Sequence, residues 1–218
     1  MTRGHEIFMT GGTGYIGRRL IPLLLARGHR VRALVRHGSE RKLPEGAEPI
    51  VGDALEAASF ADRVAPADTF IQLVGVAHPS PAKAALFRSV DLASARASVD
   101  AAARGGAAHF VYVSVARPAP VMQAYQAARA AAEEAIASRG LDATILRPWY
   151  VLGPGHRWPV ALLPFYAIAG RIPALRESAN RLRPVRLGNV LAALVLAVES
   201  PARGIRILET ADLRAARL

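Results

Sequence analysis

Three glycines at a fixed spacing stand near the start of the chain, in the segment Thr10-Gly11-Gly12-Thr13-Gly14-Tyr15-Ile16-Gly17. An apolar run at 7–10 predicts a strand before them, and apolar residues at helical spacing predict a helix over 15–27. We expect Gly11 to form the tight turn, Gly14 to admit a pyrophosphate close to the backbone, and Gly17 to pack the helix on the sheet. The free N–H groups of the helix N-terminus would bind the phosphates. The predicted cofactor-binding residues here are Gly11, Thr13, Gly14, Tyr15, Ile16 and Gly17. The alternative is a βα turn with a structural role only.

The end of the second predicted strand, at 31–35, indicates which dinucleotide is bound. An NAD site usually carries an acidic residue about 20 positions after the glycines, where it bonds to the ribose hydroxyls. This sequence has Arg36 there, with Arg41 and Lys42 nearby. A guanidinium can bind a 2′-phosphate through two parallel hydrogen bonds. The sequence therefore predicts NADP rather than NAD, and the alternative is a solvated surface arginine.

Two further strand ends fit the same cofactor. Asp53 follows a predicted strand at 49–52 and either reaches the adenine amine or caps the segment that begins at Leu55. Val74 and Gly75 end a strand that begins at Thr69, and their small size would let the cofactor lie close to the backbone. We expect all three residues to bind the cofactor.

The remaining elements alternate between strands and helices. Further strands are predicted at 110–115, 143–146 and 205–208, and helical stretches near 55–64, 86–104, 122–138 and 190–198. The strands are short and nearly all apolar, which is typical of a parallel sheet covered on both faces. We expect one α/β domain over 1–218, a doubly wound Rossmann fold. Prolines and glycines concentrate at 153–184, which predicts a loop-rich cap on the substrate side with one short helix at 160–169.

Composition narrows the classes of function. The chain has 218 residues, no cysteine and a net charge of +11, and only two of its 28 basic residues are lysines. The absence of cysteine excludes disulfides and thiolate chemistry. The 26 arginines are scattered rather than gathered in a basic run, so a nucleic-acid partner is disfavoured. No apolar run approaches the roughly 20 residues that span a bilayer, and no signal peptide is evident. We expect a soluble, cytoplasmic protein.

Several segments together resemble the extended and atypical short-chain dehydrogenase/reductases, over roughly residues 6–210. The likeness rests on the glycine segment 10–17, Gly52-Asp53, Val111-Tyr112-Val113-Ser114, the run 125–129, Arg147-Pro148, and Gly153-Pro154-Gly155. It looks closest to the atypical group that includes NmrA-like proteins and the accessory NADPH-binding subunit of respiratory complex I. The resemblance implies that Pro148 and the loop after it pass the nicotinamide.

The resemblance also implies a catalytic set of Ser114, Tyr125 and Arg129. In catalytic members a serine follows the fifth strand, and a Tyr-x-x-x-Lys opens the next helix; here arginine replaces the lysine. A tyrosine with an ordinary pKa near 10 needs a nearby cation to exchange a proton at neutral pH. Arginine supplies the charge but not the compact ammonium group. The alternatives are a serine bonded to backbone, a packed tyrosine ring, and an Arg129–Glu133 pair on an exposed helix.

A substrate mouth is expected from Tyr150, His156, Arg157 and Trp158. No histidine spacing indicates a metal site. The favoured function is an NADP(H)-dependent oxidoreductase acting on a carbonyl-type or quinone-type small molecule. The alternative is a non-catalytic NADP(H)-binding redox sensor or structural subunit. An epimerase or dehydratase of nucleotide sugars ranks lower, because it usually needs a larger C-terminal region.

Overall fold

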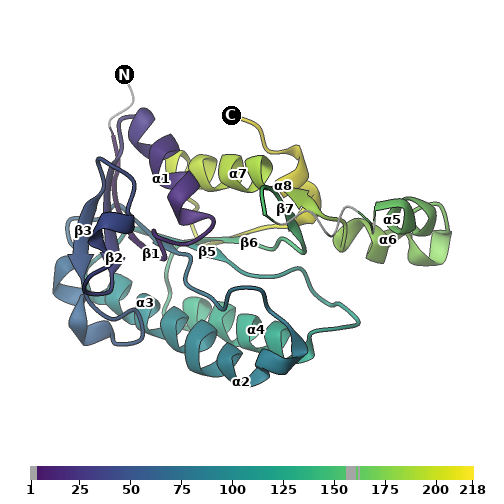
Figure 1. Cartoon of the computed structure of the whole chain (residues 1–218), viewed down its shortest axis with the longest axis horizontal. Helices are drawn as coiled ribbons and strands as arrows, with labels where there is room; N and C mark the ends of the chain where they lie inside the picture. Colours follow the sequence, from purple (N-terminus) through teal and green to yellow (C-terminus); the bar gives the residue numbers. More distant parts are fainter. Residues whose placement is uncertain (1–3, 156–160, 162) are drawn as a thin grey trace.

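A seven-stranded parallel sheet organises the chain. The computed structural model describes residues 4–155, 161 and 163–218. The strand order is β3-β2-β1-β4-β5-β6-β9, and every neighbouring pair is parallel. Figure 1 shows this sheet edge-on between two layers of helices. The strands are β1 (Glu6–Thr10), β2 (Arg30–Val35), β3 (Glu48–Val51), β4 (Thr69–Gln72), β5 (His109–Val113), β6 (Ala143–Leu146) and β9 (Ile205–Leu208). The predicted doubly wound α/β fold is confirmed.

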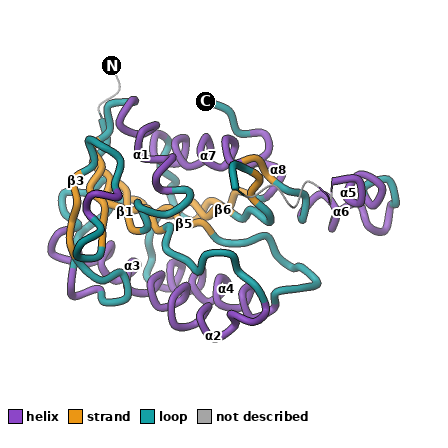
Figure 2. The backbone as a smooth tube through the Cα atoms, in the orientation of Figure 1, coloured by secondary structure: helices purple, strands orange, loops and turns teal. Residues whose placement is uncertain are grey.

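The helices divide between the two faces of the sheet, as the tube in Figure 2 also shows. One face is covered by α1 (Gly17–Ala26) and α7 (Leu187–Glu199), which pack against each other. The other face is covered by α3 (Ala93–Arg104) and α4 (Gln123–Ser138), with α2 (Ala84–Leu86) and the π-helical turn η5 (Phe87–Leu92) before them. Each face has its own apolar core, so the central strands are buried on both sides, which explains their continuous apolar sequences.

The crossover connection from β6 to β9 is left-handed, whereas such connections are normally right-handed. The chain moves from β1 to β2 in one direction through α1, and from β4 to β5 to β6 in the opposite direction through α3 and α4 on the other face. A right-handed crossover from β6 to β9 would therefore place its helix beside α4. Instead, α7 lies on the α1 face. On the α4 face, Ile205 and Ile207 of the edge strand β9 stay 43% and 40% exposed.

Several short elements were not expected from the sequence. The stretch near 55–64 forms two 3-10 turns, η2 (Ala57–Ser59) and η3 (Ala61–Arg63), rather than a helix. Two more such turns are η1 (Glu40–Lys42) and η4 (Pro81–Lys83). A last helix, α8 (Thr210–Ala215), follows β9 and starts with a capping box between Glu209 and Asp212.

The 153–184 segment contains more helix than the sequence predicted. It holds α5 (Leu163–Ala169) and also α6 (Pro173–Arg181), where proline at the first turn favours helix initiation. These two helices pack on each other and extend away from the sheet (Figure 1). A two-stranded parallel ladder of β7 (Val151–Leu152) and β8 (Val185–Arg186) closes the base of the segment. Its assignment as a substrate-side cap stays a prediction.

Candidate functional site: the carboxyl edge of the sheet

The glycine-rich turn connects β1 to α1 in a conformation that needs glycine. Gly11 has φ +78°, and a Cβ there would lie 2.7 Å from the carbonyl carbon of Leu73. A Cβ on Gly17 would collide with the Gly11 carbonyl oxygen, so this glycine allows the helix to start against the turn. The helix has no side-chain cap and no acidic residue in its first turn. Its N-terminal N–H groups therefore fit a pyrophosphate.

Arg36 lies directly after β2 and is exposed. Arg41 and Lys42 are also exposed and belong to η1. Glu40, the nearest carboxylate in sequence, lies 3.9 Å from His37 Nδ1. Within the described part of the chain no carboxylate comes within ion-pair distance of Arg36, and the remaining residues include no Asp or Glu. This strand end therefore fits a phosphate group.

Asp53 sits after β3, where its carboxylate organises the following loop. Asp53 Oδ1 accepts a hydrogen bond from the Leu55 N–H at 2.9 Å, and the Asp53 N–H donates to Ser59 Oγ at 2.9 Å. One carboxylate oxygen thus serves the capping role that the sequence allowed. A contact with the adenine amine stays a prediction.

Gly75 is required by a buried ion pair beneath it. A Cβ at Gly75 would lie 2.5 Å from Arg129 Nη2 and 3.1 Å from Asp91 Oδ1. The two groups are themselves bonded, Arg129 Nη2 to Asp91 Oδ1, at 2.5 Å. Asp91 Oδ2 accepts the N–H of Val76 at 3.1 Å. The absence of a side chain at Gly75 therefore leaves room for the ion pair. Contacts of Val74 and Gly75 with a cofactor stay predictions.

Arg129 is only 6% exposed and Asp91 is fully buried. Arg129 Nη1 also donates to the Val113 carbonyl at 2.9 Å and to the Tyr112 hydroxyl at 3.2 Å. Burial raises the pKa of Tyr112 to about 12, so its hydroxyl stays protonated. Burial also raises the pKa of Asp91, while Arg129 and the Val76 N–H oppose that rise. Arg129 thus joins α4 to η5 and to the end of β5.

Tyr125 lies one helical turn before Arg129 on α4 and is half-buried. The Arg129 Cζ lies 5.0 Å from the centre of the Tyr125 ring, on its face. The ring of Phe87 meets Tyr125 edge-on, with 5.0 Å between ring centres. The structure therefore brings together Tyr125 and Arg129 as the sequence predicted, with the cation against the ring rather than in a pair with Glu133.

Ser114 belongs to a second cluster. Its Oγ donates to Glu133 Oε1 at 2.6 Å, and both side chains are buried. Arg147 donates to Glu133 and to Glu209, and Arg117 also donates to Glu133. Burial alone would raise the pKa of Glu133, but these hydrogen bonds lower it below its usual value. Glu133 lies eight residues after Tyr125, or about 12 Å along the helix. The Ser114 hydroxyl is therefore bonded to a residue two helical turns beyond Tyr125.

The loop after β6 contributes backbone to the same edge. The Pro148 carbonyl accepts the Ala116 N–H at 2.9 Å, and the Tyr150 carbonyl accepts the Val185 N–H at 2.8 Å. Gly153 lies against Tyr15 and Leu187, so this loop touches the glycine-rich turn. Burial raises the pKa of Tyr150. The other predicted mouth residues, His156, Arg157 and Trp158, lie outside the described residues.

Sequence reasoning did not identify Asp91 as the partner of Arg129, or Glu133 as the partner of Arg117 and Arg147. Both occur in alanine-rich helical stretches, where a single acidic residue is ordinarily exposed. An acidic residue on the apolar face of a helix was the available signal for Asp91. In the described residues no group of three or more His, Asp or Glu side chains is placed to hold a metal ion.

The uncapped helix after a glycine turn, at the carboxyl edge of a doubly wound sheet, defines the class: a Rossmann dinucleotide-binding protein. A family model described as NAD(P)H-binding matches residues 11–157. The chain is 30% identical over 213 residues to a ceramide reductase of Caulobacter vibrioides, covering 95% of this chain and 65% of that protein. It is 29% identical over 232 residues to a 3-diazoavenalumate denitrifying reductase of a Streptomyces species, covering 91% and 74%.

A solved structure, the Bordetella bronchiseptica enzyme WbmH in complex with NAD+, matches with a TM-score of 0.70 and 20% identity, covering 95% of this chain and 76% of that one. The chain belongs to the NAD(P)H-binding family, whose model matches more than half of its length. It spans about two thirds of the length of the Caulobacter relative. Within the described residues no helix has the length and apolar character needed to cross a membrane.

Proposed function

We propose that this chain binds NADP(H) at the glycine-rich turn and uses it to reduce a carbonyl-type or quinone-type small molecule. The observation that carries the proposal is the α1 N-terminus, which follows a glycine turn and has neither a cap nor an acidic residue. Membership of an NAD(P)H-binding family supports the same assignment. The reductase names of two relatives favour reduction as the chemistry.

The preference for NADP over NAD rests on the end of β2. Arg36 is exposed, has no carboxylate partner in the described residues, and has two further basic residues on η1 beside it. An acidic residue at this position would bond to the ribose hydroxyls and repel a 2′-phosphate. We therefore expect NADPH to bind more tightly than NADH, with a difference that depends on Arg36.

Tyr125 is the proton donor in this proposal. The bound nicotinamide supplies the hydride. The phenolic oxygen of Tyr125 holds the proton that passes to the substrate oxygen, and the guanidinium of Arg129 lies against the face of its ring. Ser114 would have to release Glu133 before its hydroxyl contacted a substrate. We therefore assign the proton transfer to Tyr125 and only a supporting role to Ser114.

The test is NADPH oxidation across a panel of carbonyl compounds and quinones, with the wild type and Tyr125→Phe. Loss of a general acid typically lowers turnover by about 10²- to 10⁴-fold. We expect that loss together with unchanged NADPH affinity, because the phenylalanine ring keeps the contacts with Phe87 and Arg129. Full turnover in Tyr125→Phe would contradict the role of this residue.

A second candidate function is favoured by the contacts of Arg129. Both Nη atoms of Arg129 are bonded to Asp91, Val113 and Tyr112, an arrangement that can serve structure alone. On that basis the chain would be a non-catalytic NADP(H)-binding redox sensor or a subunit of a larger assembly. Tight NADPH binding without oxidation by any compound in the panel would favour this function. The cytoplasmic location and the single domain stay predictions.

A further inference from the structure

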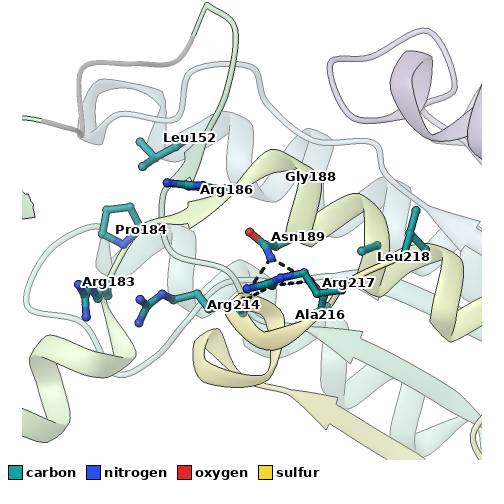
Figure 3. Close-up of a pocket in the computed structure, with 11 residues that line it drawn as sticks. Leu152, Arg183, Pro184, Arg186, Gly188, Asn189, Arg214, Ala216, Arg217 and Leu218 are labelled. Atoms are coloured by element: carbon teal, nitrogen blue, oxygen red, sulfur yellow. Dashed lines mark hydrogen bonds between the residues drawn. The ribbon is translucent and has the colours of Figure 1, made fainter.

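A pocket of about 620 Å³ lies at the opposite edge of the sheet from Arg36, between the first turns of α7 and the end of α8. Figure 3 shows four arginines around it. Arg183 precedes β8 and Arg186 belongs to it, whereas Arg214 belongs to α8 and Arg217 follows that helix. The carbonyl oxygens of residues 214 and 216 both accept hydrogen bonds from Asn189 Nδ2, which fixes the end of α8 against α7.

The four arginines have no negative partner from the chain. In the described residues none of them lies within ion-pair distance of a carboxylate, and residues 1–3, 156–160 and 162 contain no Asp or Glu. Arg217 Nη1 donates to the carbonyl oxygens of Arg214 and Ala216, at 2.8 and 2.7 Å, so its bonds are to neutral groups. The pocket therefore gathers positive charge that the protein itself does not neutralise.

Two of these side chains repel each other. Arg183 and Arg214 are half-buried, and Arg214 extends toward Arg183 in Figure 3. Burial lowers the pKa of Arg214, and the neighbouring charge of Arg183 lowers it further. Two guanidinium groups held together in a partly buried place are stabilised when an anion lies between them.

We propose that this pocket binds a phosphoryl group, carried either by a phosphorylated small molecule or by a lipid headgroup. A phosphate carries more than one negative charge and several acceptor oxygens, which suits several arginines better than a single carboxylate does. The α7 N-terminus adds partial positive charge, since it has no side-chain cap and no acidic residue in its first turn.

The size and lining of the pocket indicate more than a free ion. Its volume falls in the range of small-molecule sites, which run from about 300 to 1,000 Å³. Leu152, Pro184, Ala192 and Leu218 supply apolar surface beside the arginines. This combination fits a ligand with a charged phosphoryl end and an uncharged body.

The pocket lies away from Arg36, the predicted contact of the 2′-phosphate. Arg36 follows β2 and Arg214 follows β9, and these strands are five positions apart in the sheet, or roughly 24 Å. The strand that positions Arg36 is therefore far across the sheet from the strand that leads into α8. The proposed phosphoryl site does not depend on the proposed reductase function.

The test measures the binding of inorganic pyrophosphate by calorimetry at low ionic strength. Each titration is run with and without excess NADPH, because the α1 N-terminus could also bind a pyrophosphate. The variants are Arg183→Gln and Arg214→Gln in the pocket, Arg203→Gln as an exposed arginine elsewhere, and Arg36→Ala at the cofactor site. We expect saturable binding that each pocket variant weakens by roughly tenfold or more and that Arg203→Gln and Arg36→Ala leave unchanged. Equal affinity in the wild type and the pocket variants, or loss in Arg36→Ala alone, would overturn the proposal.

A second arm distinguishes the two sources of the phosphoryl group. Phosphatidylcholine vesicles with and without phosphatidic acid are sedimented with the same proteins. Cosedimentation that needs phosphatidic acid and is lost in both pocket variants identifies a lipid headgroup. Pyrophosphate binding without cosedimentation identifies a soluble phosphorylated molecule. Failure of both arms to depend on Arg183 and Arg214 overturns the site.

Discussion

The arginines on and beside α4 and the arginines around the α7–α8 pocket differ in the source of their negative partners. Arg129 is paired with Asp91, and Arg117 and Arg147 are paired with Glu133, all within the chain. Arg183 and Arg214, although half-buried, have no carboxylate partner among the described residues. In the first region the chain supplies the carboxylates that balance its arginines, whereas in the second region an external anion would have to do so.

The difference follows from the energetics of buried charge. A charged side chain enclosed by protein is unfavourable unless another charge or several hydrogen bonds compensate it. Where burial is nearly complete, at Arg129 and Glu133, the chain supplies the counter-charge. Where solvent still enters, the chain leaves the charge available. A compensated arginine thus indicates structure, and an uncompensated one in a pocket indicates a ligand.

Breaking the Asp91–Arg129 pair should have the largest effect. Asp91→Ala leaves a buried guanidinium without its carboxylate, and removing one partner of such a pair typically costs about 3–5 kcal/mol. Urea denaturation should show this loss in the free energy of unfolding. The double variant Asp91→Leu with Arg129→Met, which removes both charges, should recover much of it. A loss below about 1 kcal/mol in Asp91→Ala would contradict the structural role of the pair.

Glu133→Gln should cost about 2–3 kcal/mol at neutral pH, because two arginines and Ser114 lose a charged acceptor. The folded-state pKa of Glu133 is lowered, so its contribution to stability is full above its unfolded-state pKa and is lost as the pH falls through the folded-state value. The difference between wild type and variant should therefore narrow below the ordinary glutamate pKa of about 4.3. A constant difference across this range would show that folding does not lower the pKa of Glu133.

Gly75→Ala tests the packing above the first pair. The added methyl group would meet Arg129 Nη2 and Asp91 Oδ1, and overpacking of this kind usually costs about 1–3 kcal/mol. Gly188→Ala is the comparison, since a Cβ there meets open space. Alanine is favoured over glycine inside α7 by about 0.5–1 kcal/mol, so this variant should be slightly more stable than the wild type. Equal stability of the two variants would mean that the ion pair moves away easily.

Arg214→Gln should change the free energy of unfolding least, by less than about 0.5 kcal/mol, because no chain carboxylate loses a partner. Relief of its repulsion with Arg183 favours a small stabilisation. Thermal unfolding without phosphate ligands measures this directly. A destabilisation as large as that of Glu133→Gln would mean that the pocket arginines have an unrecognised structural partner.

The sequence predicted the parts of this molecule that depend on local pattern. The strands β6 and β9 were predicted residue for residue, because each is a short, mainly apolar run bounded by turn residues. The glycine turn was predicted because its spacing determines a backbone conformation. The additional helix α6 was missed, since glycines and prolines around it outweighed its polar helical sequence.

Pairings between distant segments could not be read in the same way. The partner of Arg129 comes from η5, 38 residues earlier, and depends on how a π-helical turn is placed against α4. The local i, i+4 rule suggested Glu133 instead, and that pairing does not form. The pocket combines β8, α7 and α8, and α8 was not predicted. Features formed within one segment could be predicted from the sequence. Side-chain pairs and pockets formed between distant segments could be identified only from the structure.

The most direct test of the proposed cofactor is a fluorescence titration with NADPH and with NADH. Wild type, Arg36→Ala and the exposed control Arg104→Ala are compared. A charge-assisted contact with a 2′-phosphate is worth about 1.5–3 kcal/mol, so Arg36→Ala should weaken NADPH binding by roughly 10- to 100-fold. NADH binding should not change, and Arg104→Ala should match the wild type. Equal binding of both cofactors regardless of Arg36 would contradict the NADP assignment, and no saturable binding of either would contradict the dinucleotide site itself.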